Sequence, residues 1–176
     1  MRLLRECEVR AFDIGTAAHE MIHLAVSVSG LDRDPRRLPL WFHEGLATQF
    51  EVVRGGRWAG ISRAHDLRLP DWRAIPTPPP LIPLLRDVGF GRGYDRGLYA
   101  ESWALVDFLR KTRPKAVLNF IDMLRNPDNR EVGNVDRAVD RFRQAFGDDL
   151  PSLEAEWHRF TTALKTPLDE HDPQAR

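Results

Sequence analysis

The sequence predicts a mainly helical fold with at most a small β-sheet near its N-terminus. Apolar residues recur at helical spacing in most segments, whereas the alternation typical of strands is confined to two short stretches, 5–12 and 57–61. A length of 176 residues is enough for one domain with its own core. We therefore expect a single domain over residues 1–176, with at most a remnant strand within 1–12 and a frayed tail at 167–176.

The helices are expected in the following order along the chain. Asp13 or Thr16 caps a first helix that runs to about Val28 and stops at Ser29-Gly30. Pro39 starts a second helix that runs from Leu40 to about Val53. A Pro-rich stretch, 69–83, is read as a loop that wraps the domain. The remaining helices are expected at 84–87, 99–111, 115–124 and 134–146, and after Asp148-Asp149-Leu150-Pro151.

Composition excludes several classes of partner and site. The chain has 26 basic and 26 acidic residues, which argues against binding to nucleic acid or to an anionic membrane surface. Cys7 is the only cysteine, so a metal must be held by histidines and carboxylates. The sequence shows no apolar run long enough to span a bilayer and no signal peptide, which predicts a cytoplasmic protein as written. Localisation stays open if the chain is a fragment, because only 18 residues precede His19.

An HExxH motif, His19-Glu20-Met21-Ile22-His23, lies in the first long helix. Residues four apart share one face of a helix, so both imidazoles can reach a single ion, with Glu20 on the flank of that face. This arrangement is typical of zinc hydrolases in which the glutamate is the general base. The rest of the helix is nearly all apolar, which predicts that it is buried, and a bound cation would satisfy its buried polar groups.

A second motif, Trp41-Phe42-His43-Glu44-Gly45-Leu46-Ala47, follows in the next helix. The chain between His23 and Glu44 is long enough for the second helix to return Glu44 to the histidine pair. Gly45 inside a helix costs about 1 kcal/mol relative to Ala, and close approach of the two helices at the metal is one reason for it. Glu51 lies seven residues beyond Glu44, on the same face, where it can hold the free N–H of a metal-bound histidine.

These two motifs resemble those of the gluzincin metallopeptidases, the thermolysin- and aminopeptidase-N-like group, and in particular their bacterial peptidase MA-like relatives. The resemblance continues through Leu98-Tyr99-Ala100-Glu101-Ser102-Trp103 and the C-terminal helices, over roughly residues 13–165. It implies a zincin-like helical catalytic domain that hydrolyses peptide bonds in a peptide or protein substrate. The sequence has no recognisable amine-anchoring motif of the aminopeptidase kind, which slightly favours an endopeptidase over an exopeptidase.

The resemblance also implies a role for each matching residue. His19, His23 and Glu44 would bind one Zn2+ ion, Glu20 would be the general base, and Tyr99 would stabilise the oxyanion. Tyr94, on the glycine-rich turn, is the rival of Tyr99 for that role. In the family, a strand upstream of HExxH pairs with extended substrate, and only residues 5–12 are placed to supply one here.

Two other readings stay open at this point. The chain is alternatively a non-catalytic, zinc-stabilised interaction domain, either a pseudo-peptidase or a fragment without the substrate-binding strands, or a helical domain without metal. Oligomeric state is not indicated by the sequence. Of the remaining histidines, His43 is read as a surface or packing residue, because it points about 100° away from Glu44 on the helix. His65-Asp66 is a loop candidate for substrate binding, and the tryptophans at helical spacing are read as core.

Overall fold

The computed structural model describes residues 2–31, 38–61, 63–93, 95–125 and 135–170. These residues form a mainly helical fold with one two-stranded sheet, as the sequence predicts. The helices are α1 (Arg2–Val28), α2 (Leu40–Thr48), α3 (Arg68–Arg73), α4 (Leu81–Leu85), α5 (Arg96–Thr112), α6 (Pro114–Arg125), α7 (Val135–Phe146), α8 (Leu150–Ala163) and α9 (Pro167–Glu170). The strands β1 (Val53–Arg54) and β2 (Arg57–Trp58) pair antiparallel, with Val53 opposite Trp58.

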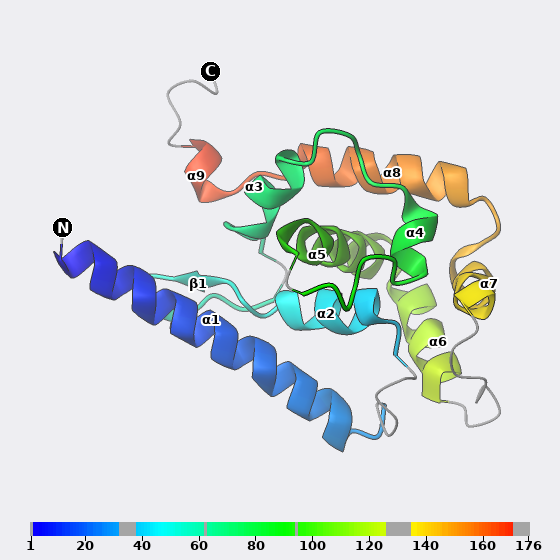
Figure 1. The fold of residues 1–176 in the computed structure, drawn as a ribbon, viewed down its shortest axis with the longest axis horizontal. Helices are drawn as coiled ribbons and strands as arrows, with labels where there is room; N and C mark the ends of the chain where they lie inside the picture. Colours follow the sequence, from blue (N-terminus) through cyan, green and yellow to red (C-terminus); the bar gives the residue numbers. More distant parts are fainter. Residues whose placement is uncertain (1, 32–37, 62, 94, 126–134, 171–176) are drawn as a thin grey trace.

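Helix α5 is the centre of the fold, and five other helices pack against it (Figure 1). Every residue from Ser102 to Leu109 is buried. The helix begins at Arg96, three residues before the predicted start, because the Asp95 carboxylate accepts hydrogen bonds from the backbone N–H groups of Gly97 and Leu98, at 2.8 and 3.3 Å. Contacts of α5 with α2, α3, α4, α6 and α8 give this buried helix apolar neighbours on several sides.

Aromatic side chains fill the core on two sides of α5. Trp41 and Phe42 of α2 pack against Phe120 and Phe142, from α6 and α7, with ring centroids 5.4 to 6.0 Å apart. On another side, Trp72 of α3 lies 5.0 Å from Trp157 of α8. Buried aromatic pairs of this kind contribute beyond the area that they bury. The reading of these tryptophans as core is therefore confirmed.

The strand expected at residues 5–12 is wrong, because these residues lie within α1. Five of these eight residues are arginine, glutamate or alanine, with no Gly or Pro before Gly15, so helical propensity outweighs a loose apolar–polar alternation. Asp13 and Thr16 consequently lie inside α1 and cap nothing, although the helix does end at Val28 as predicted. Among the described residues, the only sheet is the β1–β2 hairpin, which lies beside α1.

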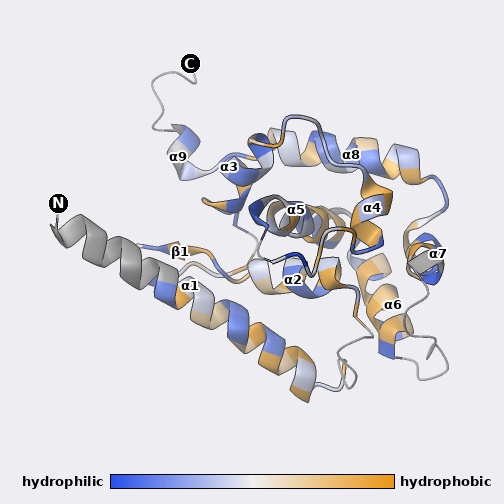
Figure 2. Cartoon of the chain, viewed as in Figure 1, coloured by the Kyte–Doolittle hydropathy of each residue, from blue (hydrophilic) through white to orange (hydrophobic). Residues whose placement is uncertain are grey.

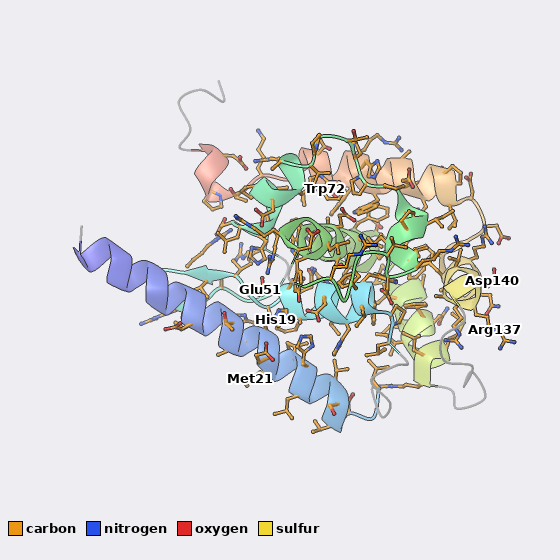
Figure 3. All side chains as sticks on the ribbon, in the orientation of Figure 1. His19, Met21, Glu51, Trp72, Arg137 and Asp140 are labelled. Carbon is orange, nitrogen blue, oxygen red and sulfur yellow. The ribbon has the colours of Figure 1, made fainter. Side chains whose placement is uncertain are left out.

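The prediction that this helix is buried on all sides is also wrong. Met21, Leu24 and Val28 are 67%, 63% and 77% exposed, whereas His19 is 8% exposed. Within the part of the chain that the structure describes, α1 contacts α2 and the hairpin, so its opposite side has no cover (Figure 1). Figure 2 shows the apolar residues along this helix, and Figure 3 places Met21 on its outer side.

Helix α2 is held at both ends by side-chain hydrogen bonds to distant parts of the chain. Pro39 precedes the helix and has no capping side chain. Instead, the Asp87 carboxylate accepts hydrogen bonds from the backbone N–H groups of Leu40 and Trp41, both at 2.9 Å. Asp87 has a φ of 53°, a left-handed conformation that Asp tolerates better than most residues. At the other end, the Gln49 amide donates to the carbonyl oxygens of Gly45 and of Trp103 in α5, so α2 ends at Thr48, earlier than predicted.

Gly45 allows the close approach of α2 to α5, rather than to the first helix as the sequence suggested. A Cβ at this position would lie 2.5 Å from the carbonyl oxygen of Ser102 and 2.7 Å from Cγ2 of Val106. We expect Gly45→Ala to lower the free energy of unfolding by about 1–3 kcal/mol, because the backbones must separate. Urea unfolding measures this loss. Gly97→Ala is the matched control, since its Cβ would meet only the Asp95 side chain; equal stability of both variants would contradict the close-packing argument.

The C-terminal segment is more ordered than the frayed tail that the sequence suggests. Residues 167–170 form α9, where Asp169 accepts hydrogen bonds from the backbone N–H of Thr166, at 2.6 Å, and from the Arg73 guanidinium. Residues 171–176 of the predicted tail lie outside the described residues. None of the helices in the described part of the chain has the length and apolar character that crossing a bilayer requires.

Candidate metal centre

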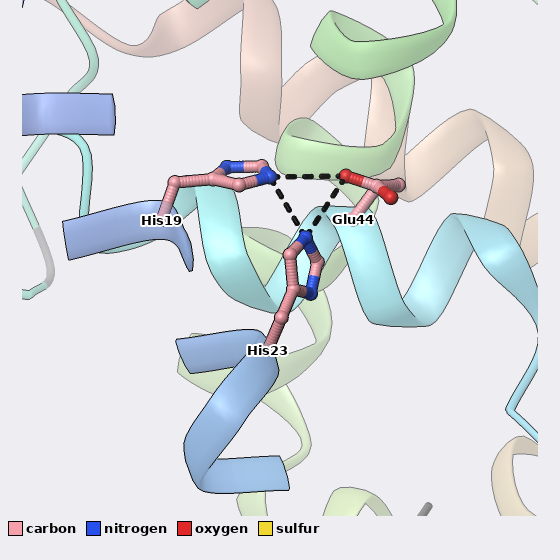
Figure 4. A group of neighbouring side chains, drawn as sticks. All are labelled: His19, His23 and Glu44. Carbon is pink, nitrogen blue, oxygen red and sulfur yellow. Dashed lines mark hydrogen bonds and ion pairs between the residues drawn. The ribbon is translucent and has the colours of Figure 1, made fainter. Parts of the chain in front are cut away.

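Three side chains from two helices bring one ligand atom each to a common point (Figure 4). His19 and His23 lie one turn apart on α1, and Glu44 lies on α2. The two Nε2 atoms are 2.9 Å apart, and Glu44 Oε2 is 3.2 Å from that of His19 and 3.6 Å from that of His23. Ligands of a tetrahedral zinc ion with bonds of about 2.0–2.1 Å are separated by about 3.3–3.4 Å, so this triangle has the size of one face of such a site.

Each of the two imidazoles has a hydrogen-bond partner behind it, at Nδ1. His19 Nδ1 lies 2.7 Å from Glu51 Oε1, and a carboxylate can only accept there, so Nδ1 carries the proton. His23 Nδ1 lies 2.9 Å from His43 Nε2. Glu44 Oε2 is buried and accepts no well-formed hydrogen bond among the described residues. In neutral imidazoles with protonated Nδ1 atoms, two nitrogen lone pairs and a carboxylate oxygen would face one another, and this arrangement requires a cation.

A proton can take the place of that cation in the metal-free protein. Burial lowers the pKa of His19, but its contacts with Glu44 and Glu51, and their negative charges, outweigh burial and raise this pKa to about 9. Burial raises the pKa of Glu44, while its contacts with His19 and His23 and their positive charge bring it down to about 2. A metal that binds here therefore displaces the His19 proton, so affinity for zinc should fall with falling pH.

These shifts predict a pH optimum for the stability of the metal-free protein. The raised pKa of His19 contributes stability below its ordinary value of 6.5, and this contribution is lost as pH rises through about 9. The lowered pKa of Glu44 contributes above its ordinary value of 4.5 and is lost as pH falls through about 2. Chelator-treated protein should therefore melt highest between about pH 4.5 and 6.5. Thermal melts from about pH 4 to 9.5 test it, with zinc-loaded protein as the control; an unchanged melting temperature from about pH 6.5 to 9.5 without metal would contradict it.

Glu51 holds His19 from behind, as the sequence predicts, although it lies in the turn after α2 rather than on the helix. Its carboxylate also accepts from His65 Nε2 at 2.9 Å and from Nε and Nη2 of Arg68, both at 3.1 Å. Burial raises the pKa of Glu51, but hydrogen bonds from His19 and His65 and the positive charge of Arg68 hold it well below its usual range. The carboxylate is therefore ionised whenever the protein is folded at neutral pH.

Gly15 lets α1 approach the backbone of Glu51. It lies one turn before His19, and a Cβ at this position would be 2.8 Å from the Glu51 carbonyl oxygen. The short distance between His19 Nδ1 and Glu51 Oε1 thus depends on a glycine as well as on the two polar side chains. Figure 3 shows His19 and Glu51 side by side where α1 passes the start of the hairpin.

The sequence surrounding these residues matches one protein family. Residues 13–132 match a family described as "Protein of unknown function (DUF1570)". The chain belongs to the DUF1570 family. No curated protein and no solved structure matches this chain. The DUF1570 match spans both histidines of the site, Glu44 and Glu51, so the candidate metal centre lies within the family region, and the description of the family assigns it no activity.

Two further predicted site residues of the DUF1570 region differ in how they lie relative to these three side chains. The Glu20 side chain is exposed, and it forms no hydrogen bond or ion pair with the described residues, so it is accessible to water. The Tyr99 ring, at the start of α5, lies 6.3 Å from the His19 ring and 5.2 Å from the Arg68 guanidinium. Its rival, Tyr94, lies outside the described residues.

Three side chains near the candidate metal centre were given no role in it from the sequence. His43, read as a surface or packing residue, is half-buried against His23, with ring centroids 4.1 Å apart. His65, read as a substrate-binding candidate, is buried behind Glu51, while its neighbour Asp66 pairs with Arg54. Arg68 had no assigned role. The one signal in the sequence was that His43 directly precedes Glu44. Two successive residues of α2 can contact the same side chain of a neighbouring helix from different directions, as His43 and Glu44 do with His23.

Proposed function

We propose that this protein is a zinc-dependent peptidase of the gluzincin type. The observation that carries the proposal is the convergence of His19 Nε2, His23 Nε2 and Glu44 Oε2, within 3.6 Å of one another, with the proton of the His19 ring directed away from them. Two neutral imidazoles and one carboxylate, with a fourth position left for water, are the donor set of catalytic zinc sites. The HExxH motif and the Trp41–Ala47 segment support the same class by resemblance.

The residues around the proposed metal divide the chemistry between them. Zinc, when bound, would polarise the scissile carbonyl and acidify water. Glu20, exposed on the flank of the ligand face, would accept the proton of the attacking water and return it to the leaving amine. Tyr99, on the side of His19 formed by α5, would donate a hydrogen bond to the oxygen that gains charge in the transition state.

One observation favours a second candidate, a zinc-stabilised interaction domain without catalytic activity. Extended substrate in the resembling families pairs with a strand, and residues 5–12, expected to supply it, are helical. The β1–β2 hairpin, beside α1, contains the only strands among the described residues. Under this alternative the zinc would support folding, and the domain would bind a peptide or protein without cleaving it.

Metal analysis combined with a cleavage assay separates the candidates. Purified protein should contain one zinc ion per chain and should cleave casein or unstructured peptides in a chelator-sensitive way. Bound zinc without cleavage would favour the interaction domain. Protein that takes up no zinc, even after reconstitution, would overturn both candidates and favour a helical domain without metal.

A further inference from the structure

The side chains behind Glu51 form a buried cluster that the proposed peptidase mechanism does not use. Glu51 lies between His19 on one side and the pair His65 and Arg68 on the other. His65 and Arg68 are both buried, and Arg68 is the first residue of α3. A buried arginine is costly to desolvate, so its placement here requires a partner of opposite charge. Glu51 is that partner, at 2.9 Å from Arg68 Nη2.

Hydrogen bonds fix the direction of every proton in this cluster. The backbone N–H groups of Leu67 and Arg68 donate to His65 Nδ1, at 3.2 and 3.3 Å. His65 Nδ1 is therefore an acceptor, and the ring proton is on Nε2, from which it is donated to Glu51 Oε2. The Arg68 guanidinium has only donors, and its Nε and Nη2 reach different oxygens of the same carboxylate. Glu51 is thus held from two directions and cannot rotate without losing hydrogen bonds.

We propose that Arg68, assisted by His65, is a positioning residue that acts on the metal through Glu51. The guanidinium fixes the Glu51 carboxylate, the carboxylate fixes the His19 ring with its proton on Nδ1, and His19 Nε2 is left free to bind the metal. Partners that orient metal-binding histidines typically change metal affinity about 10–100-fold when they are removed. This inference rests on the proposed metal centre, but not on peptide hydrolysis.

The charge of Arg68 bears on the net charge of the bound ion, separately from the orientation of His19. Glu44 and Glu51 together carry two negative charges, which would cancel the charge of a divalent cation. Arg68 neutralises Glu51 at close range, so the ion with Glu44 as its one anionic ligand retains a net positive charge. The same guanidinium lies over the Tyr99 ring, 5.2 Å from its centroid, and so also borders the side of the site where the oxyanion would form.

A double-mutant cycle read out by zinc affinity tests the proposal. Zinc binding is measured by competition with a chromophoric chelator for the wild type, Arg68→Gln, Glu51→Gln and the double variant. We expect Arg68→Gln to bind zinc about tenfold more weakly. If Arg68 acts through Glu51, the double variant should bind about as weakly as Glu51→Gln alone, because the second change removes nothing further. A purely structural role for Arg68 would instead make the two losses additive.

Arg54→Gln is the matched control. Arg54 also directs Nε and Nη2 at one carboxylate, that of Asp66, both at 3.1 Å, and Asp66 is the residue after His65. It touches neither Glu51 nor a ligand, so its loss should leave zinc affinity unchanged. Arg68→Lys is measured in parallel in case Arg68→Gln does not fold. Lysine keeps the charge but not the two-pronged geometry, so zinc affinity should again fall, and it should not fall further in the Glu51→Gln background.

The possible failures are distinguishable. Full zinc affinity in a folded Arg68→Gln or Arg68→Lys variant would overturn the role of Arg68 and leave the metallopeptidase proposal standing. If the losses of zinc affinity in Arg68→Gln and Glu51→Gln add up in the double variant, the role of Arg68 would likewise be overturned and the metallopeptidase proposal would stand. A wild-type protein that binds no zinc would overturn the metal centre itself, and the role of Arg68 with it. Zinc binding without peptide cleavage would remove the peptidase assignment alone and leave the cycle interpretable.

Discussion

Glu20→Gln is expected to retain zinc and to lose peptide hydrolysis almost completely. The Glu20 side chain is exposed and contacts none of the three ligands, so the substitution leaves the metal centre intact. Glutamine has nearly the shape of glutamate but cannot accept the proton of the attacking water. General base catalysis typically contributes about 10²–10⁴-fold, and we expect a loss in kcat of at least this size. Zinc content by elemental analysis and kcat on a peptide substrate are the two measurements.

Asp13→Asn provides the control for this variant. Asp13 is also an exposed carboxylate on α1 and lies seven residues earlier, on the same side of the helix. Its substitution removes the same charge without approaching the metal, so kcat should not change. Retained turnover in Glu20→Gln would remove Glu20 from the mechanism. Loss of zinc in that variant would instead show that Glu20 supports the metal site itself.

His23→Ala is expected to lose zinc and the stability that zinc confers. Two of the three protein ligands remain, and the substitution also removes the hydrogen bond to His43. Zinc at 100 times its Kd would stabilise the folded wild type by about 2.7 kcal/mol, and the variant should gain none of this. The measurement is the rise in melting temperature on addition of zinc to chelator-treated protein.

The control for His23→Ala is His158→Ala, in α8. His158 Nε2 lies 2.9 Å from the carbonyl oxygen of Pro79, outside the metal centre. This variant can lose stability, but its melting temperature should rise with zinc as much as that of the wild type. An equal rise with zinc in His23→Ala would show that the ion binds elsewhere, and the ligand assignment would then be wrong.

The convergence of His19, His23 and Glu44 could be predicted from sequence because short-range geometry determines most of it. A spacing of four residues on a helix fixes the relation of His19 to His23, and the Trp41–Ala47 segment marked Glu44 by resemblance. The position of Glu51 was found for a partly incorrect reason. It was expected on the same helical face as Glu44, but α2 ends at Thr48, and the segment that follows brings the carboxylate to His19.

The remainder of the site depends on tertiary contacts that local patterns do not encode. His65 and Arg68 reach Glu51 from a segment 14 and 17 residues further along the chain, where no periodicity marked them. The N-terminal part of α1 was misread because a short alternation of apolar and charged residues fits a strand as well as a helix. The exposure of Met21, Leu24 and Val28 on the same helix was misjudged, because the sequence does not show which apolar side of a helix packs against a neighbour.

The capping of α2 by Asp87 has a consequence for the order in which this chain assembles. The three candidate ligands and Glu51 leave the ribosome before Asp87 does, and the donors at the start of α2 receive their acceptor only from this residue, 47 positions after Leu40. Helix α5, against which Gly45 is packed, is translated later still. We therefore expect a nascent chain that carries all three ligands to hold metal only weakly, and to take it up firmly after the central helix has emerged.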